Sequence, residues 1–290
     1  MNISKRINPE REKRRLVVIG SPISHSLSPI IHNAALKSAG IEHLYSYEAL
    51  LVKDKSLQGF VQKMRNKEIY GVNVTIPHKT AIIPYLDRIT SEASSIGAVN
   101  TVFREDDKLV GHNTDYQGFL MSLNDAQIKI KGKTVLILGS GGSARAIAPA
   151  IAANNPIEIY LMSRNADSAN DLAKGLEKKI KIISSDENNL KEFVANSDLI
   201  INCTPLGMKG KLEGQTLIYS NMLNKNQTVV DLVYNPNKTN LLVEAEKAGC
   251  KTLNGLSMLI YQAALSFELF TGIKPSLTIM KESLEDFLKY

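Results

Sequence analysis

Cysteine, long apolar stretches and spaced metal ligands are all scarce in this sequence. The 290 residues include only two cysteines, Cys203 and Cys250, and neither forms a spaced cluster with histidines. This excludes the common zinc motifs, and so few cysteines favour a reducing compartment. No apolar stretch is long enough to cross a bilayer. We therefore expect a cytoplasmic protein with no resident metal and no membrane partner.

Net positive charge is also scarce outside the N-terminus, although the formal net charge is +6. Residues 1–15 contain six basic and two acidic side chains, so the rest of the chain carries only about +2. A short basic leader without aromatic residues is typical of a solvated, frayed terminus. Binding of nucleic acid by this leader is the weaker alternative. Its apolar part is too short for a signal peptide.

The most informative stretch is the segment 133–145, near the middle of the chain. Val135–Leu138 is an apolar, β-branched run that predicts a buried strand. Gly139, Gly141 and Ala144 then give the pattern G-x-G-x-x-A, followed by an Ala-rich helix. The glycines permit a tight turn and close approach of a pyrophosphate to the helix N-terminus. An ordinary strand–helix turn is the alternative, but the flanking strand and helix favour dinucleotide binding.

Strands alternate with helices along the whole chain, which predicts an α/β fold. From Val135 onward the alternation is regular and predicts a doubly wound sheet, whose ligands bind at the carboxyl ends of the strands. The length is sufficient for two domains. The strand Ile157–Met162 is followed by Ser163 and Arg164 rather than by an acidic residue. Because arginine pairs with a ribose 2′-phosphate, this favours NADP over NAD.

Polar side chains in the first half gather where predicted strands end. A hydroxyl-rich loop contains Ser26 and Ser28, and Ser28 is also a natural N-cap for the helix that follows. Asn73 and Thr75 share a side-chain direction if their strand continues. Lys79 stands at a predicted helix start, where a cation opposes the helix dipole, so a functional role is favoured over a solvated accident.

Two further polar residues each have two interpretations. Asp115 precedes the helix that begins at Tyr116, so it is either an N-cap or a catalytic carboxylate. Gln262 lies in the apolar segment 254–270, either as a hydrogen-bonded core amide or as a ligand contact. The sequence alone leaves both open.

Together these segments resemble the shikimate dehydrogenase family, from about Leu16 to about Gly272. The resemblance rests on eight motifs in order, namely Ser26–Pro29, Asn73–Lys79, Gly97–Thr101, Asn113–Asp115, Gly139–Ser143, Asn202–Met208, Asp231–Tyr234 and Gly255–Gln262. The family reduces 3-dehydroshikimate to shikimate with NADPH in aromatic amino-acid biosynthesis. The resemblance therefore implies an oxidoreductase whose partner is a small-molecule substrate, and it leaves monomer and homodimer open.

The resemblance also implies residue roles and domain boundaries. Lys79 and Asp115 would be the catalytic pair. The substrate would contact Ser26, Ser28, Asn73, Thr75, Lys79, Asn100, Asp115, Tyr234 and Gln262. The cofactor would contact Gly139, Ser140, Gly141, Gly142, Ser143, Ala144, Ser163, Arg164, Thr204, Met208, Gly255 and Met258. A substrate domain would comprise residues 16–115 and 255–290, a Rossmann domain residues 116–254, and a leader residues 1–15.

Two alternatives remain beside NADP-dependent shikimate dehydrogenase. A quinate/shikimate dehydrogenase shares the fold and the catalytic pair and often uses NAD; Arg164 is the only basic residue in the segment 163–168. A non-catalytic dinucleotide-binding sensor would bind the cofactor without turnover. The paired serines Ser26 and Ser28 favour the shikimate-specific branch, and the presence of Lys79 and Asp115 argues against the sensor.

Overall fold

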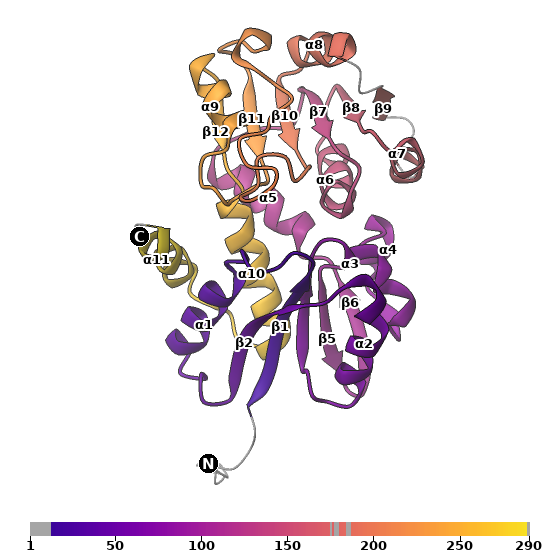
Figure 1. The fold of residues 1–290 in the computed structure, drawn as a ribbon, viewed down its shortest axis with the longest axis vertical. Helices are drawn as coiled ribbons and strands as arrows, with labels where there is room; N and C mark the ends of the chain where they lie inside the picture. The colour runs from indigo at the N-terminus through magenta and orange to yellow at the C-terminus, as the bar shows by residue number, and fades with distance from the viewer. Residues whose placement is uncertain (1–12, 175, 177–179, 184–186, 289–290) are drawn as a thin grey trace.

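The computed structural model describes residues 13–174, 176, 180–183 and 187–288. Figure 1 shows two α/β halves, each built on one sheet, with the helices α5 (Asp115–Asp125) and α10 (Leu256–Thr271) between them. The two helices pack against each other. The two helices can approach closely because Gly118 of α5 lacks a side chain. A Cβ at this position would lie only 2.8 Å from the backbone nitrogen of Gln262 on α10.

The first half contains a mixed sheet with the strand order β2-β1-β3-β5-β6-β4. Strands β1, β2 and β3 run parallel, whereas β5 pairs with both of its neighbours in antiparallel fashion. The elements are β1 Arg14–Gly20, α1 Ser28–Ser38, β2 Tyr45–Leu51, α2 Leu57–Arg65, β3 Gly71–Val74, α3 His78–Ala81, β4 Arg88–Ile89, α4 Ser91–Ile96, β5 Thr101–Glu105 and β6 Lys108–His112.

The second half contains a parallel sheet with the order β12-β11-β10-β7-β8-β9. This is the doubly wound order of dinucleotide-binding domains. The elements are β7 Thr134–Leu138, α6 Gly142–Ala153, β8 Glu158–Met162, α7 Ala166–Ala173, β9 Ile180–Ile183, α8 Glu187–Ala195, β10 Leu199–Asn202, β11 Thr228–Asp231, α9 Asn240–Lys247 and β12 Lys251–Leu253.

The chain then returns to the first half through α10 and α11 (Leu277–Leu288). Apolar side chains of β1 and α1 form one core cluster with Phe267 and Phe270 of α10 and with Met280 of α11. Burial of such side chains contributes about 1.5–3 kcal/mol each. The C-terminal helices are therefore part of the first half, as the resemblance implies, and Figure 1 shows α11 beside α1.

The structure corrects several boundaries. β1 begins at Arg14, inside the expected leader, because the Arg14 guanidinium lies over the rings of Tyr45 and Tyr70 and Arg15 pairs with Glu48. Residues 1–12 lie outside the described residues. β11 ends at Asp231, so the rest of the Asp231–Tyr234 motif lies in the loop that follows, and the sequence analysis did not anticipate β9 or α8.

Candidate active site

A cavity of about 370 Å³ lies between the two halves, a volume typical of small-molecule sites. It is formed by the carboxyl ends of β1, β3 and β10, by the loop after β11 and by α10. The cavity lining includes fourteen of the residues expected at the site: Ser26, Ser28, Asn73, Thr75, Lys79, Asn100, Asp115, Ser143, Thr204, Met208, Tyr234, Gly255, Met258 and Gln262.

Lys79 and Asp115 form an ion pair at this cavity. The Lys79 Nζ atom lies 2.7 Å from Asp115 Oδ2, and only 10% of the lysine side chain and 7% of the aspartate side chain are exposed. Lys79 Nζ also lies 3.4 Å from the Ser143 hydroxyl of the glycine-rich loop. Such a lysine can donate a proton to a ligand oxygen while the carboxylate holds it in place.

Asp115 is not an N-cap, because its carboxylate has tertiary partners. The helix cap carries no side-chain bond. Instead, Asn113 Oδ1 accepts the backbone N–H groups of Asp115 and Tyr116. Asn100 Nδ2 donates to Asp115 Oδ1 at 2.8 Å, so an amide on the chain before β5 and the lysine on α3 each hold one carboxylate oxygen.

Ser28 is not an N-cap either, because α1 already begins at Ser28 and its cap residue is Leu27, with no side-chain cap bond. The Ser28 hydroxyl lies near the phenol of Tyr47, and the Ser26 hydroxyl lies near the phenol of Tyr234. Burial raises the pKa of both phenols, so both remain neutral and able to donate. The serines thus stand in a cluster of hydroxyl groups at one end of the cavity.

The glycine-rich loop after β7 fits a dinucleotide. Gly139 has φ +96°, and a Cβ there would lie 2.9 Å from the Thr204 side chain. No atom lies within 4 Å of the position that a Cβ of Gly141 would take, so a ligand can approach the backbone. The helix α6 begins at Gly142 without a side-chain cap, which leaves its N–H groups free for an anion. Ala144 is fully buried against the sheet.

Seven expected cofactor residues lie outside the cavity lining: Gly139, Ser140, Gly141, Gly142, Ala144, Ser163 and Arg164. Ser163 and Arg164 follow β8, the strand beside β7 in the sheet. The Ser163 hydroxyl lies 2.7 Å from the Ser140 hydroxyl of the loop after β7. The exposed Arg164 stands before α7, which is capped by Asn165. The residues therefore extend from the cavity along the carboxyl edge of the sheet, as an elongated dinucleotide requires.

Three family models match successive parts of the chain. The shikimate dehydrogenase substrate binding domain matches residues 18–102, the shikimate / quinate 5-dehydrogenase model residues 122–240, and the shikimate 5'-dehydrogenase C-terminal domain residues 255–285. An NADP(+) shikimate dehydrogenase of Dehalococcoides mccartyi is 42% identical over 272 residues, covering 92% of this chain and 94% of its own. The chain belongs to the shikimate dehydrogenase family.

Solved structures agree with this membership. Shikimate 5-dehydrogenase of Thermus thermophilus in complex with NADP(H) and shikimate is 35% identical, with a TM-score of 0.83 over 94% of this chain and 99% of its own. The Listeria monocytogenes enzyme, in complex with shikimate and NAD, is 37% identical, with a TM-score of 0.83 over 97% and 99% of the two chains.

Asp231 of this family member lies in the Asp231–Tyr234 motif, and the sequence analysis predicted no role for it. Its carboxylate is completely buried and accepts bonds from Asn202 Nδ2 at 2.9 Å, from the Val233 N–H at 3.0 Å and from the Thr239 hydroxyl at 2.6 Å. Asn202 Oδ1 in turn accepts the backbone N–H and hydroxyl of Thr204. One carboxylate–amide pair therefore holds two loops that line the cavity. Burial raises the pKa of Asp231 to about 6.

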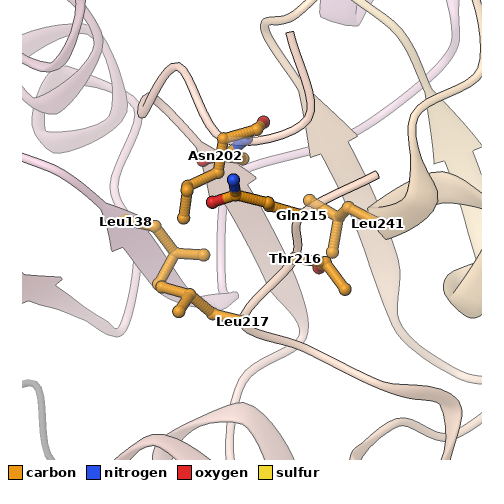
Figure 2. A pocket seen from close by; sticks show the side chains of 7 residues that line it. Leu138, Asn202, Gln215, Thr216, Leu217 and Leu241 are labelled. Atoms are coloured by element: carbon orange, nitrogen blue, oxygen red, sulfur yellow. The ribbon is translucent and has the colours of Figure 1, made fainter. Parts of the chain in front are cut away.

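A second, much smaller cavity lies behind the loop that follows β10. Figure 2 shows the side chains of Leu138, Asn202, Gln215 and Leu241 converging on it. Its volume of about 10 Å³ is room for about one water molecule, so it is no substrate site. In the described part of this family member, no cluster of metal-ligating side chains occurs, and no helix has the length and apolarity to cross a membrane.

Proposed function

We propose that this protein catalyses the reversible, NADPH-dependent reduction of 3-dehydroshikimate to shikimate. The observation that carries the proposal is the buried Lys79–Asp115 pair, at the cavity between the substrate half and the glycine-rich loop. Membership of the family supports the same activity. The pair of Lys79 and Asp115 is complete, which argues against the alternative of a sensor that binds the cofactor without turnover.

We assign the substrate carboxylate to the hydroxyls of Ser26 and Ser28, and the ring hydroxyls to Asn73, Thr75, Asn100 and Gln262. Tyr234 borders the substrate, and Met208, Gly255 and Met258 border the cofactor. The dinucleotide would be held by the loop from Gly139 to Ala144, with Ser163, Arg164 and Thr204. All of these residues lie on the cavity or on the adjoining sheet edge.

Reduction requires one hydride at the carbonyl carbon and one proton at its oxygen. NADPH supplies the hydride when bound. Lys79 donates the proton from Nζ as charge develops on the oxygen, and Asp115 holds Nζ in place. Oxidation of shikimate follows the reverse path, in which Lys79 accepts the hydroxyl proton.

We further assign residues 16–115 and 255–290 to the substrate domain and residues 116–254 to the cofactor domain. Both described cysteines are free thiols, which agrees with a cytoplasmic protein in a reducing compartment.

The deciding experiment measures initial rates of the purified protein with shikimate and with quinate, each with NADP and with NAD. Turnover of shikimate with NADP supports the proposal. Turnover of quinate with NAD would instead place the protein with the quinate/shikimate dehydrogenases, and cofactor binding without any turnover would favour the sensor.

The catalytic assignment is tested by Lys79→Met, with Lys79→Ala beside it. A Cβ on Gly142 would lie 3.0 Å from Lys79 Cδ, so the lysine stem packs on the cofactor loop, and methionine preserves most of this contact. We expect kcat of Lys79→Met to fall about 10²–10⁴-fold, while the Kd for NADPH changes little. A kcat near that of the wild type would refute the assignment.

A further inference from the structure

A tyrosine that the sequence analysis did not single out lies directly behind the substrate site. Tyr47 on β2 is 3% exposed and does not line the cavity. Its hydroxyl lies 2.6 Å from Asn73 Oδ1 and near the Ser28 hydroxyl. One phenol therefore bonds a residue assigned to the ring hydroxyls.

The directions of these bonds follow from the surroundings of Asn73. Its amide nitrogen lies 3.1 Å from the Thr101 hydroxyl and 3.4 Å from the carbonyl oxygen of Asn100. Because a carbonyl oxygen only accepts, Nδ2 faces Asn100 and Oδ1 faces Tyr47. Tyr47 must then donate to Oδ1.

This arrangement limits what Asn73 can offer a ligand. Both amide hydrogens have acceptors in the protein, and one lone pair of Oδ1 is taken by Tyr47. What remains is the second lone pair of Oδ1, which is an acceptor. Asn73 is thus set to receive a hydrogen from a substrate hydroxyl and would face a keto or carboxylate oxygen without a hydrogen bond.

Packing behind the phenol keeps it in place. The ring of His32 is stacked on the ring of Tyr47 with the centroids 4.0 Å apart and the planes at 4°. His32 is completely buried, and within the described residues neither ring nitrogen has a hydrogen-bond partner. Burial lowers the pKa of His32 to about 3 and raises that of Tyr47. The pair therefore stays neutral at working pH, so the phenol keeps its hydrogen.

We propose that Tyr47 is a positioning residue that makes the substrate site specific for a ring hydroxyl at Asn73. It acts through Asn73 without itself touching the substrate. The identity of the ring hydroxyls as those of shikimate rests on the proposed function. The expectation that Asn73 Oδ1 accepts a hydrogen from a ligand hydroxyl rests only on the directions of the hydrogen bonds around Asn73.

The test compares Tyr47→Phe with the control Tyr45→Phe. Both tyrosines lie on β2 in the same core cluster, but the Tyr45 hydroxyl bonds Arg14, away from the cavity. Tyr47→Phe keeps the stacked ring and loses only the hydroxyl. We expect KM for shikimate to rise about tenfold, with kcat reduced less than threefold and KM for NADP unchanged. Tyr45→Phe should leave all three constants unchanged.

Specificity is measured by comparing kcat/KM for shikimate with kcat/KM for 4-deoxyshikimate and for 5-deoxyshikimate. We expect the wild type to discriminate against the analogue that lacks the hydroxyl at Asn73, and Tyr47→Phe to lose most of that discrimination. A merely structural role would lower Tm and affect both analogues and NADP alike. Unchanged KM and unchanged discrimination in Tyr47→Phe would overturn the inference.

A crystal structure of Tyr47→Phe separates this inference from the proposed function. We expect the Asn73 amide to turn or shift once Oδ1 loses its donor, whichever substrate the wild type uses. An Asn73 side chain in its original place, with both Nδ2 bonds intact, would refute positioning by Tyr47. Absence of shikimate turnover in the wild type would instead refute the proposed function.

Discussion

The buried carboxylate of Asp231 predicts an unusual dependence of stability on pH. Its pKa rises from 3.8 to about 6, chiefly through burial, against the opposing bonds from Thr239, Val233 and Asn202. A shift of about 2 units corresponds to about 3 kcal/mol. Because the folded-state pKa is the higher one, this stabilising contribution is complete below about pH 4 and is lost as pH rises through about 6.

The perturbation is Asp231→Asn, which keeps the shape and one acceptor oxygen and removes the titration. Unfolding free energies of both proteins are measured by urea denaturation at intervals from pH 4 to pH 7.5. We expect the wild-type value, relative to the variant, to fall by about 2.4 kcal/mol over this range, with a steepest slope of about 1.2 kcal/mol per pH unit.

The control is Glu244→Gln, for which the sign is opposite. Hydrogen bonds from Lys247 and from the Ser220 backbone lower the pKa of Glu244 to about 2, so the stabilising contribution of its carboxylate is lost as pH falls below about 4.5. A difference between wild type and Asp231→Asn that stays flat with pH, or rises with it, would refute the account of Asp231. A flat result would mean that the carboxylate is hydrated in solution.

Three further outcomes are expected. His32→Phe should remove an acid-labile group: burial lowers the pKa of His32 from 6.5 to about 3, so the wild type should lose about 2 kcal/mol relative to the variant between pH 7 and pH 5, seen in urea midpoints. Gly255→Ala should lower the free energy of unfolding by about 1–3 kcal/mol, because the added Cβ would lie 2.2 Å from the Leu232 carbonyl oxygen. The control Gly59→Ala, where nothing lies within 4 Å of the added Cβ, should be neutral or stabilising in the same urea denaturation measurements. Arg164→Ala should raise KM for NADP at least tenfold and leave KM for NAD unchanged; equal effects on the two cofactors would contradict recognition of the 2′-phosphate by Arg164.

The elements that the sequence predicted well are those set by local signals. The run from Val135 to Leu138 and the following Gly139 fixed a strand and a turn, because an apolar β-branched run must be buried and few residues other than glycine adopt a φ of +96°. Gly97 likewise ends α4 in the left-handed conformation. In these places the local preference and the tertiary fold agree.

The roles that local signals could not assign belong to polar side chains with distant partners. Ser28 and Asp115 both stand at helix starts, where a cap is the ordinary local role. Ser28 instead lines the cavity without capping α1, and Asp115 bonds Lys79 and Asn100, each at least 15 positions away along the chain. Tyr47 and His32 were missed for a related reason: an aromatic residue in a strand or helix is typical of a core, and nothing local indicates which hydroxyl faces a site.

The return of α10 and α11 to the first half affects how the chain can fold during synthesis. The apolar face of β1 and α1 is covered by side chains of residues 259–284, which leave the ribosome last. The sheet of the second half, from β7 to β12, is contiguous in sequence and can close while its neighbour still exposes Leu16, Val18 and Ile31. Nascent chains stalled before residue 256 should therefore protect the second sheet from protease and leave the first one cleavable.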